Sequence, residues 1–103
     1  MPSKYRAVPT IVDGIRFASK KEAAHYGTLK ILERAGKITG LELQRRFPLV
    51  VNGQKVCTYV SDFDYFDESG KQIVEDVKGF KTPAYRLKKK LMQIILGIEI
   101  SEV

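Results

Sequence analysis

Two acidic motifs in the second half of the chain have residue types and a spacing that suit phosphate chemistry. In the run Glu75-Asp76-Val77-Lys78, a strand conformation puts Asp76 and Lys78 on one face, because successive strand side chains point to opposite faces. A five-residue loop, 67–71, pairs this strand with the preceding one so that Asp62 lies directly opposite Asp76. The β-carbon atoms of such a pair are roughly 4.5–5.5 Å apart.

Two carboxylates in this position repel each other, so their pairing predicts a positive charge between them. A divalent cation is the economical choice, because Mg²⁺ binds one or two carboxylates together with water and substrate phosphate. We expect Mg²⁺ as the cofactor, with Mn²⁺ able to substitute. An ammonium at Lys78 could orient or help deprotonate an attacking water, or stabilise charge on the phosphate. The alternative is an ordinary hairpin in which Lys78 neutralises the two acids.

The charge distribution supports a polyanionic partner. The chain has 103 residues and a formal net charge of +6. The segment 56–77 has six acidic residues and one basic residue, a net of −5, so the rest of the chain carries +11. An acidic segment in a basic protein binds phosphates poorly unless its acids hold cations, and nucleic acid is the expected partner. The alternative is a protein that is basic without a polyanionic ligand.

Length and composition exclude several classes of protein. The single cysteine, Cys57, rules out an internal disulfide and a thiolate metal cluster. No run approaches the roughly 18 apolar residues that span a bilayer, and the first residues lack the apolar core of a secretory signal. We therefore expect a cytoplasmic protein with no membrane association. We also expect a single domain over residues 1–103, with a short mobile start at 1–6.

The first third of the chain predicts a hairpin followed by a helix. Asp13-Gly14 between apolar runs is typical of a tight hairpin turn within 8–17. Ser19 and Glu22 match a capping box, and Gly36 marks the helix stop. The helical period puts Tyr26 toward water. The expected apolar face comprises Ala24, Thr28, Ile31, Leu32 and Ala35.

The remainder predicts three strands, a helix and a last strand. We expect extended chain over 38–51 with a break or an edge at Pro48, a hairpin turn at Asn52-Gly53, and strands over 56–66 and 72–78, the last ended by Gly79. A second helix begins at Thr82-Pro83, ends at Gly97, and leads to a strand over 98–103. Its expected apolar stripe is Leu87, Leu91, Ile94 and Ile95.

Several neighbours of the acidic pair have structural explanations. Asp64 shares the face of Asp62 and is expected to be solvated or to lie just outside the site. Glu75, on the opposite face, is expected to form a salt bridge. Tyr59, Phe63 and Tyr65 alternate along one strand, and core packing explains them better than base stacking. His25 is expected to be a helix-flank residue rather than a ligand, and Cys57 a small buried apolar group.

These residues and the order of elements resemble the PD-(D/E)xK nuclease superfamily. The resemblance implies an α/β (α+β) fold with a restriction-endonuclease-like α-β-β-β-α-β core, a mixed sheet and an N-terminal β-hairpin. Within that superfamily the chain is similar to small phage- and prophage-type endonucleases that are also Holliday junction resolvase-like. One departure is Ser61, which stands where the superfamily pattern has proline. The matching runs are 13–23, 41–47, 59–63, 75–79 and 82–88.

The resemblance also implies roles for individual residues. Asp62 matches the first acid of the superfamily, Asp76 matches the acid of the (D/E)xK motif, and Lys78 matches its lysine. Glu22 matches an acid that many members supply from the first helix as a further metal ligand. For Glu22 the alternative is its capping role. Gln44 is a possible additional polar residue of the site.

Together these features predict a metal-dependent DNA endonuclease. A homodimer with two such sites could cut a branched junction symmetrically, whereas a single site would nick DNA or cut flaps. The alternative is a non-catalytic DNA-binding or partner-binding module that keeps the nuclease fold. Basic side chains expected to contact DNA phosphates are Lys20, Lys21, Arg45, Arg46, Arg86, Lys88 and Lys89.

Overall fold

The computed structural model describes residues 8–77 and 81–103, and these form an α+β fold with mixed β-structure. The predicted mobile start, and Lys78 with the strand end predicted at Gly79, lie outside the described residues. The elements in chain order are β1 (Thr10–Val12), β2 (Ile15–Phe17), α1 (Lys20–Arg34), β3 (Thr39–Leu43), β4 (Arg46–Val51), β5 (Gln54–Val60), β6 (Phe63–Phe66), β7 (Gln72–Asp76), α2 (Pro83–Leu96) and β8 (Ser101–Glu102).

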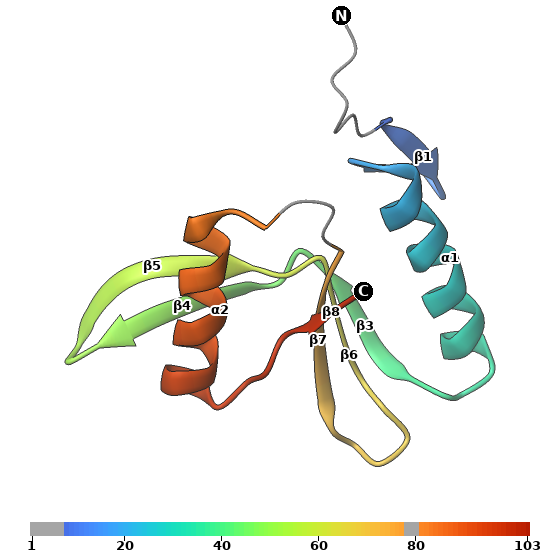
Figure 1. Ribbon diagram of the computed structural model, residues 1–103. Coiled ribbons are helices and arrows are strands. Elements are labelled where there is room, and N and C mark those ends of the chain that lie inside the picture. Colours follow the sequence, from blue (N-terminus) through green and yellow to red (C-terminus); the bar gives the residue numbers. More distant parts are fainter. Residues whose placement is uncertain (1–7, 78–80) are drawn as a thin grey trace, which may run out of the picture.

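A four-stranded sheet in the order β3-β6-β7-β8 forms the centre of the molecule (Figure 1). The β3/β6 and β6/β7 pairs are antiparallel, whereas β8 returns through α2 to lie parallel to β7. Phe63 and Tyr65 face α1, while Val74 faces α2, so the two helices cover opposite faces of the sheet. The predicted order of hairpin, helix, strands, helix and strand is confirmed, but the described residues between α1 and α2 form five strands, β3 to β7, where three were predicted.

The chain from β3 to β6 forms one long hairpin that bends in the middle. The inner halves, β3 and β6, belong to the central sheet, and the outer halves, β4 and β5, form a separate two-stranded ribbon. At the bend, the Gln44 N–H donates to the Asp62 carbonyl oxygen over 3.3 Å, and the Ser61 N–H donates to the Arg45 carbonyl over 3.0 Å. The bend therefore places Asp62 at the junction of sheet and ribbon.

The predicted positions of this break were wrong. The sequence suggested a break or an edge at Pro48 and a continuous strand over 56–66. Pro48 lies inside β4, opposite Thr58, so the break was wrong, whereas the edge is confirmed because β4 belongs to a two-stranded ribbon. Proline is tolerated there because a two-stranded ribbon has edges that need no ladder hydrogen bond. The chain bends instead at Gln44, whose φ of 52° is in the left-handed region, and at Ser61-Asp62 on the facing strand.

The buried face of α1 also differs from the prediction. Ala23, Tyr26 and Leu29 are buried, whereas Ile31 is 65% exposed. The reason is the β1–β2 hairpin, which packs against this helix: the Tyr26 ring lies 5.0 Å from that of Phe17. The Tyr26 hydroxyl also donates to Asp13 Oδ2 over 3.2 Å. Of the other residues on the expected apolar face, Ala24, Thr28 and Ala35 are exposed and Leu32 is partly buried.

The ends of α2 are as predicted, but its packing face is rotated. Thr82 Oγ1 accepts a hydrogen bond from the Tyr85 N–H over 3.1 Å, and Gly97 ends the helix with φ 68°. Tyr85 and Met92 are the buried residues of the helix, because α2 packs against the inner face of the β4–β5 ribbon. Leu91 and Ile95 are partly buried, whereas Leu87 and Ile94 are 59% and 68% exposed.

Neither helix in the described parts of the chain is long and apolar enough to cross a membrane.

Candidate functional site

The site is built on the predicted β6–β7 register. Asp64 pairs with Val74 and Phe66 with Gln72, as predicted. Asp62 immediately precedes β6, and its N–H donates to the Glu75 carbonyl over 3.1 Å. Its Oδ2 accepts from the Val77 N–H over 2.7 Å.

The two acids of the motif are in contact. The Asp62 side chain is hydrogen-bonded to that of Asp76, which is only 2% exposed. Burial, this hydrogen bond and the neighbouring negative charges raise the pKa of Asp62 to about 7, against the lowering effect of the Val77 N–H. At neutral pH the pair therefore tends to keep a proton. A divalent cation can take the place of that proton, because its positive charge also offsets the repulsion between the two carboxylates.

Tyr59 fixes the orientation of Asp76 from the ribbon. Its hydroxyl donates to Asp76 Oδ2 over 2.6 Å in a fully buried contact. Burial and this hydrogen bond raise the pKa of the Tyr59 phenol far above its usual value, so it stays a donor. The sequence pattern identified Tyr59 only as a core residue. The sequence did contain a signal: tyrosine stands at a core position that phenylalanine would fill equally well. Because a buried hydroxyl needs a hydrogen-bond partner, a tyrosine there predicts a polar neighbour.

A pocket of about 450 Å³ opens beside Asp62. It brings together Glu22 from α1 and Gln44 from the bend, the two further residues that the sequence proposed for the site. The charge of Glu22 contributes to the raised pKa of Asp62. The backbone N–H of Glu22 donates to Ser19 Oγ over 3.1 Å, which is one half of the predicted capping box. The pocket is lined by Pro9, Arg16, Phe17, Ala18, Glu22, Gln44 and Asp62.

A second pocket, of about 240 Å³, lies on the α2 side of the pair. Asp76, Tyr59 and Tyr85 line it together with Lys88, so this predicted DNA-binding lysine reaches the neighbourhood of the acids. The acidic pair thus lies between two openings, one lined by Glu22 and Gln44 and the other by a lysine. The second pocket is also lined by Thr58, Val60, Thr82 and Ala84.

Glu102 extends the row of acids, and nothing in the sequence pattern singled it out. It lies opposite Asp76 in the parallel β7/β8 pair. Its carboxylate accepts from the Tyr85 hydroxyl over 2.7 Å and pairs with Lys81 at 2.8 Å and Lys89 at 3.3 Å. These contacts lower the pKa of Glu102 to about 2, so it stays ionised. These contacts connect α2 to β8, the strand that lies beside Asp76.

The remaining acids of the segment have structural partners. Asp64 is fully buried, so the expectation that it is solvated was wrong. It accepts from Gln72 Nε2 over 2.9 Å and pairs with Arg45 at 3.4 Å, because burying a carboxylate requires such partners. On the opposite face, Glu75 forms the predicted salt bridge, with His25 at 2.7 Å, and also accepts from the Tyr65 hydroxyl over 2.6 Å.

The donor set suits a hard cation. Across residues 8–77 and 81–103, no three His, Cys, Asp or Glu side chains converge as a metal cluster. The Asp62–Asp76 pair needs no third acid, because Mg²⁺ keeps several waters and takes phosphate oxygens. Glu22 as a direct ligand stays a prediction. Lys78 stays one too, because it lies outside the described residues.

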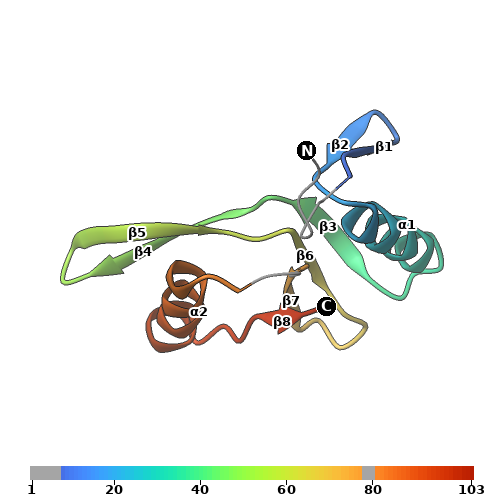
Figure 2. The same ribbon diagram turned by 45° about the horizontal axis from the view of Figure 1, so that its top comes forward.

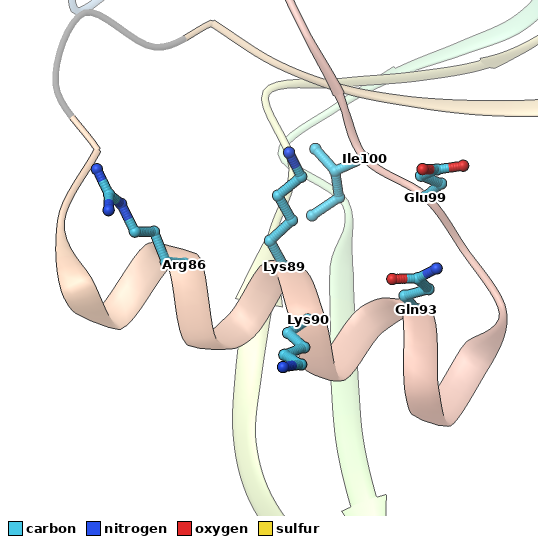
Figure 3. A pocket seen from close by; sticks show the side chains of 6 residues that line it. All are labelled: Arg86, Lys89, Lys90, Gln93, Glu99 and Ile100. Atoms are coloured by element: carbon cyan, nitrogen blue, oxygen red, sulfur yellow. The ribbon is translucent and has the colours of Figure 1, made fainter.

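The predicted DNA-contacting residues are spread over the bend, the ribbon base and both helices. Lys20 and Lys21 are exposed at the start of α1, and Arg46 is exposed at the ribbon base. On α2, Arg86 and Lys89 point from the helix into a shallow pocket of about 230 Å³ (Figure 3). That pocket is lined by Arg86, Lys89, Lys90, Gln93, Glu99 and Ile100.

Comparison with known proteins gives a single finding. The family model described as "Protein of unknown function (DUF1064)" matches residues 2–96. Neither the curated proteins nor the solved structures contain a match. The match spans Glu22, Gln44, Asp62 and Asp76 but ends before Glu102, and it attaches no activity to them.

Proposed function

We propose that this chain, which belongs to the DUF1064 family, is a metal-dependent endonuclease that hydrolyses phosphodiester bonds in DNA. The observation that carries the proposal is the contact between Asp62 and Asp76, two carboxylates on adjacent strands with a raised pKa for Asp62. Such an arrangement disfavours the metal-free ionised state and favours a bound divalent cation.

The topology supports a restriction-endonuclease-like fold. The antiparallel strands β3, β6 and β7 follow α1, and α2 then leads to β8, which is parallel to β7. This is the α-β-β-β-α-β order of the superfamily that the sequence resembles, with the β4–β5 ribbon inserted between its first two strands and the β1–β2 hairpin preceding it. The acids lie at the end of the central strands, as a nuclease of this kind requires.

In the proposed site, Asp62 and Asp76 hold Mg²⁺ or Mn²⁺, with Glu22 and Gln44 contributing from the larger pocket. A bound cation polarises the scissile phosphate and lowers the pKa of a water that attacks it. Tyr59 keeps the Asp76 carboxylate turned toward the site. Lys78 is assigned the role of orienting that water or stabilising the charge on the phosphate.

The basic groups around the pair favour a nucleic-acid substrate. Lys88 lines the pocket next to Asp76, and Arg86 is exposed two residues earlier on the same helix. Such groups bind phosphates without reading bases, so we propose that the enzyme recognises DNA shape, with branched DNA as a candidate substrate. A cytoplasmic location fits this substrate, and a homodimer would bring two sites to one junction.

A second candidate is a non-catalytic DNA-binding or partner-binding module of the same fold. It would bind DNA through the same exposed basic side chains, among them Arg46 and Arg86, without a metal at the acidic pair. The two candidates differ in one property, because only the nuclease consumes DNA when Mg²⁺ is added.

A cleavage assay separates them. Linear duplex, flap and four-way junction DNA are incubated with the protein, with and without Mg²⁺. The nuclease proposal expects Mg²⁺-dependent products that Asp62→Asn reduces by at least about 100-fold. Glu68→Gln is the matched control, because this exposed loop acid lies outside the site. If the protein binds these DNA substrates but cleaves none of them, the nuclease proposal is wrong and the binding module is the remaining candidate.

A further inference from the structure

The β4–β5 ribbon stands outside the part of the fold that builds the acidic pair. It is a two-stranded sheet of its own, and its tip extends beyond α2 in both views of the molecule (Figures 1 and 2). Its base adjoins the site, because Arg46 pairs with Val60 two residues before Asp62. The ribbon is therefore an arm that starts beside the acids and projects away from them.

The charged residues of this arm are all basic. Residues 46–60, which form the ribbon and its turn, contain no aspartate or glutamate and two basic residues, Arg46 and Lys55. The exposed tip carries hydrogen-bonding side chains, namely Asn52, Gln54 and Lys55. A net charge of +2 over these 15 residues contrasts with the acidic sheet next to them.

One face of the arm is supported and the other is free to bind. Leu49 and Tyr59 pack with Met92 of α2, so the helix stiffens the inner face. The tip is a tight turn in which Asn52 and Gly53 both have positive φ, 51° and 77°, as in the primed turns that match strand twist. Away from α2 the ribbon has exposed valines: Val50 (42%), Val51 (43%), Val56 (59%) and Val60 (41%).

We infer that the β4–β5 ribbon is a DNA-binding arm, which lies in a groove of the duplex beside the bond that is cut. The inference rests on the proposed function and adds to it the element that holds the substrate. A two-stranded ribbon fits the major groove, which is about 12 Å wide. Cationic and amide side chains at the tip contact phosphates and base edges, and exposed valines pack against thymine methyl groups or sugars.

The length of the arm sets the position of its contacts. β5 runs six residue steps from Gln54 to Val60, beside the bend, a span of about 20 Å at roughly 3.3 Å per residue. An arm that follows the groove thus reaches about 6 base pairs from the bend beside the acids, at about 3.4 Å per pair. The protected region should extend to one side of the cleavage position only.

The absence of acidic groups is the reason to choose DNA over a protein partner. An arm that docked on a second copy of this basic chain would bring like charges together, whereas a phosphate backbone complements Arg46 and Lys55. The valines alone would suit either partner, so the choice depends on charge.

The test uses the full chain and a labelled duplex about three helical turns long, with Ca²⁺ present to hold cleavage off. Lys55→Gln and Gln54→Ala are made together, away from the turn residues. We expect DNA binding about 3- to 10-fold weaker and a salt slope lower by about 0.9. Protection should be lost only at the far edge of the footprint. Lys71→Gln is the matched control, because it removes one charge from the tip of the other hairpin, β6–β7.

Failure of the arm and failure of the nuclease proposal give different results. If the tip variant binds DNA like the wild type while the wild type cleaves DNA in Mg²⁺, the inference of a DNA-binding arm is wrong and the nuclease proposal is supported. If arm-dependent binding is found with no cleavage, the arm stands and the nuclease is wrong. A change in sedimentation coefficient for Val56→Thr, with DNA affinity unchanged in both variants, would make the ribbon a contact between copies and overturn the inference.

Discussion

The hydroxyl of Tyr59 and the carboxylate of Asp76 are joined by a buried hydrogen bond of 2.6 Å. This contact crosses from the ribbon to the central sheet, so the extension of the fold and its acidic centre are mechanically connected. Tyr59 precedes the bend and Asp76 ends β7, and each side chain limits the orientation of the other. The ribbon is therefore a support of the acidic pair as well as an arm.

Replacing Tyr59 by phenylalanine tests this support. Tyr59→Phe keeps the ring packing but removes a hydrogen bond to a charged group, which should lower the free energy of unfolding by about 1.5–3 kcal/mol. It should also weaken Mn²⁺ binding, because the Asp76 carboxylate loses its orientation. Denaturant unfolding and metal titration measure the two effects.

Tyr65→Phe is the control for Tyr59→Phe. It removes an equally short hydrogen bond, of 2.6 Å, from Glu75 on the opposite face of the same strand. A similar loss of stability with unchanged Mn²⁺ affinity is expected. Equal metal affinity in both variants would show that Tyr59 has only a structural role.

The acidic pair predicts an unusual dependence of stability on pH in metal-free protein. Burial and Asp76 raise the pKa of Asp62 from 3.8 to about 7. A raised folded-state pKa gives a stabilisation that is fully present below about pH 4 and lost as the pH rises through about 7. Asp62→Asn removes this dependence, so the variant should melt several degrees above the wild type at pH 8 in EDTA.

Added divalent cation should reverse that order. Millimolar Mg²⁺ or Mn²⁺ stabilises the wild type by binding only its folded state, whereas Asp62→Asn gains little. Melting curves of both proteins at pH 8, with and without cation, test the point. Equal stabilisation of the two proteins by Mn²⁺ would remove Asp62 from the metal site.

Local signals in the sequence predicted most of the elements and their pairing. Ser19, Thr82 and Gly97 mark the helix ends as expected, since caps depend on residues within one turn. The loop 67–71 sets the β6–β7 register, and this register predicts that Asp62 and Asp76 lie beside each other, as they do. Pairing across a short hairpin is a local property.

What the sequence did not predict depends on contacts between distant segments. Tyr26 is buried because a hairpin eight residues before it folds over α1, and the helical period alone turned it outward. Glu102 becomes part of the site only through the parallel pairing of β8 with β7. The bend at Gln44 lacks the proline or glycine that usually marks one, whereas Pro48, which the sequence marks as a break or an edge, lies within a ribbon strand.

Gln44 offers a way to separate backbone strain from side-chain function. Its φ of 52° is uncommon for a glutamine, and glycine adopts it without steric cost. Gln44→Gly should therefore raise the melting temperature or leave it unchanged, while Gln44→Ala keeps the strain. If Gln44 acts in the site, both variants lose Mg²⁺-dependent cleavage equally despite their different stabilities. Full cleavage by Gln44→Gly would exclude a role for the amide.

Glu102 predicts an acid-sensitive contact at the start of α2. Its pKa is lowered from 4.5 to about 2 by Lys81, Tyr85 and Lys89. A lowered folded-state pKa gives a stabilisation that is present above about pH 4.5 and lost as the pH falls through about 2. Glu102→Gln should therefore lower the melting temperature at pH 7 and flatten its decline between these two values. Glu99→Gln, an exposed neighbour on the same segment, should behave as the wild type.

The basic face of α2 predicts that two neighbouring cations differ in their effects. Lys89 is paired with Glu102, whereas Arg86 is exposed at the rim of the α2 pocket (Figure 3). Arg86→Gln should flatten the dependence of log K for DNA on log salt by about 0.9, with little change in stability. Lys89→Gln should lower the melting temperature at pH 7, because Glu102 loses a partner, and Glu102→Gln should mask that loss in the double variant. Metal affinity should stay unchanged in both single variants, since neither side chain contacts the acidic pair. An unchanged salt slope for Arg86→Gln would move the phosphate-binding surface away from α2, toward Lys20, Lys21 and the ribbon.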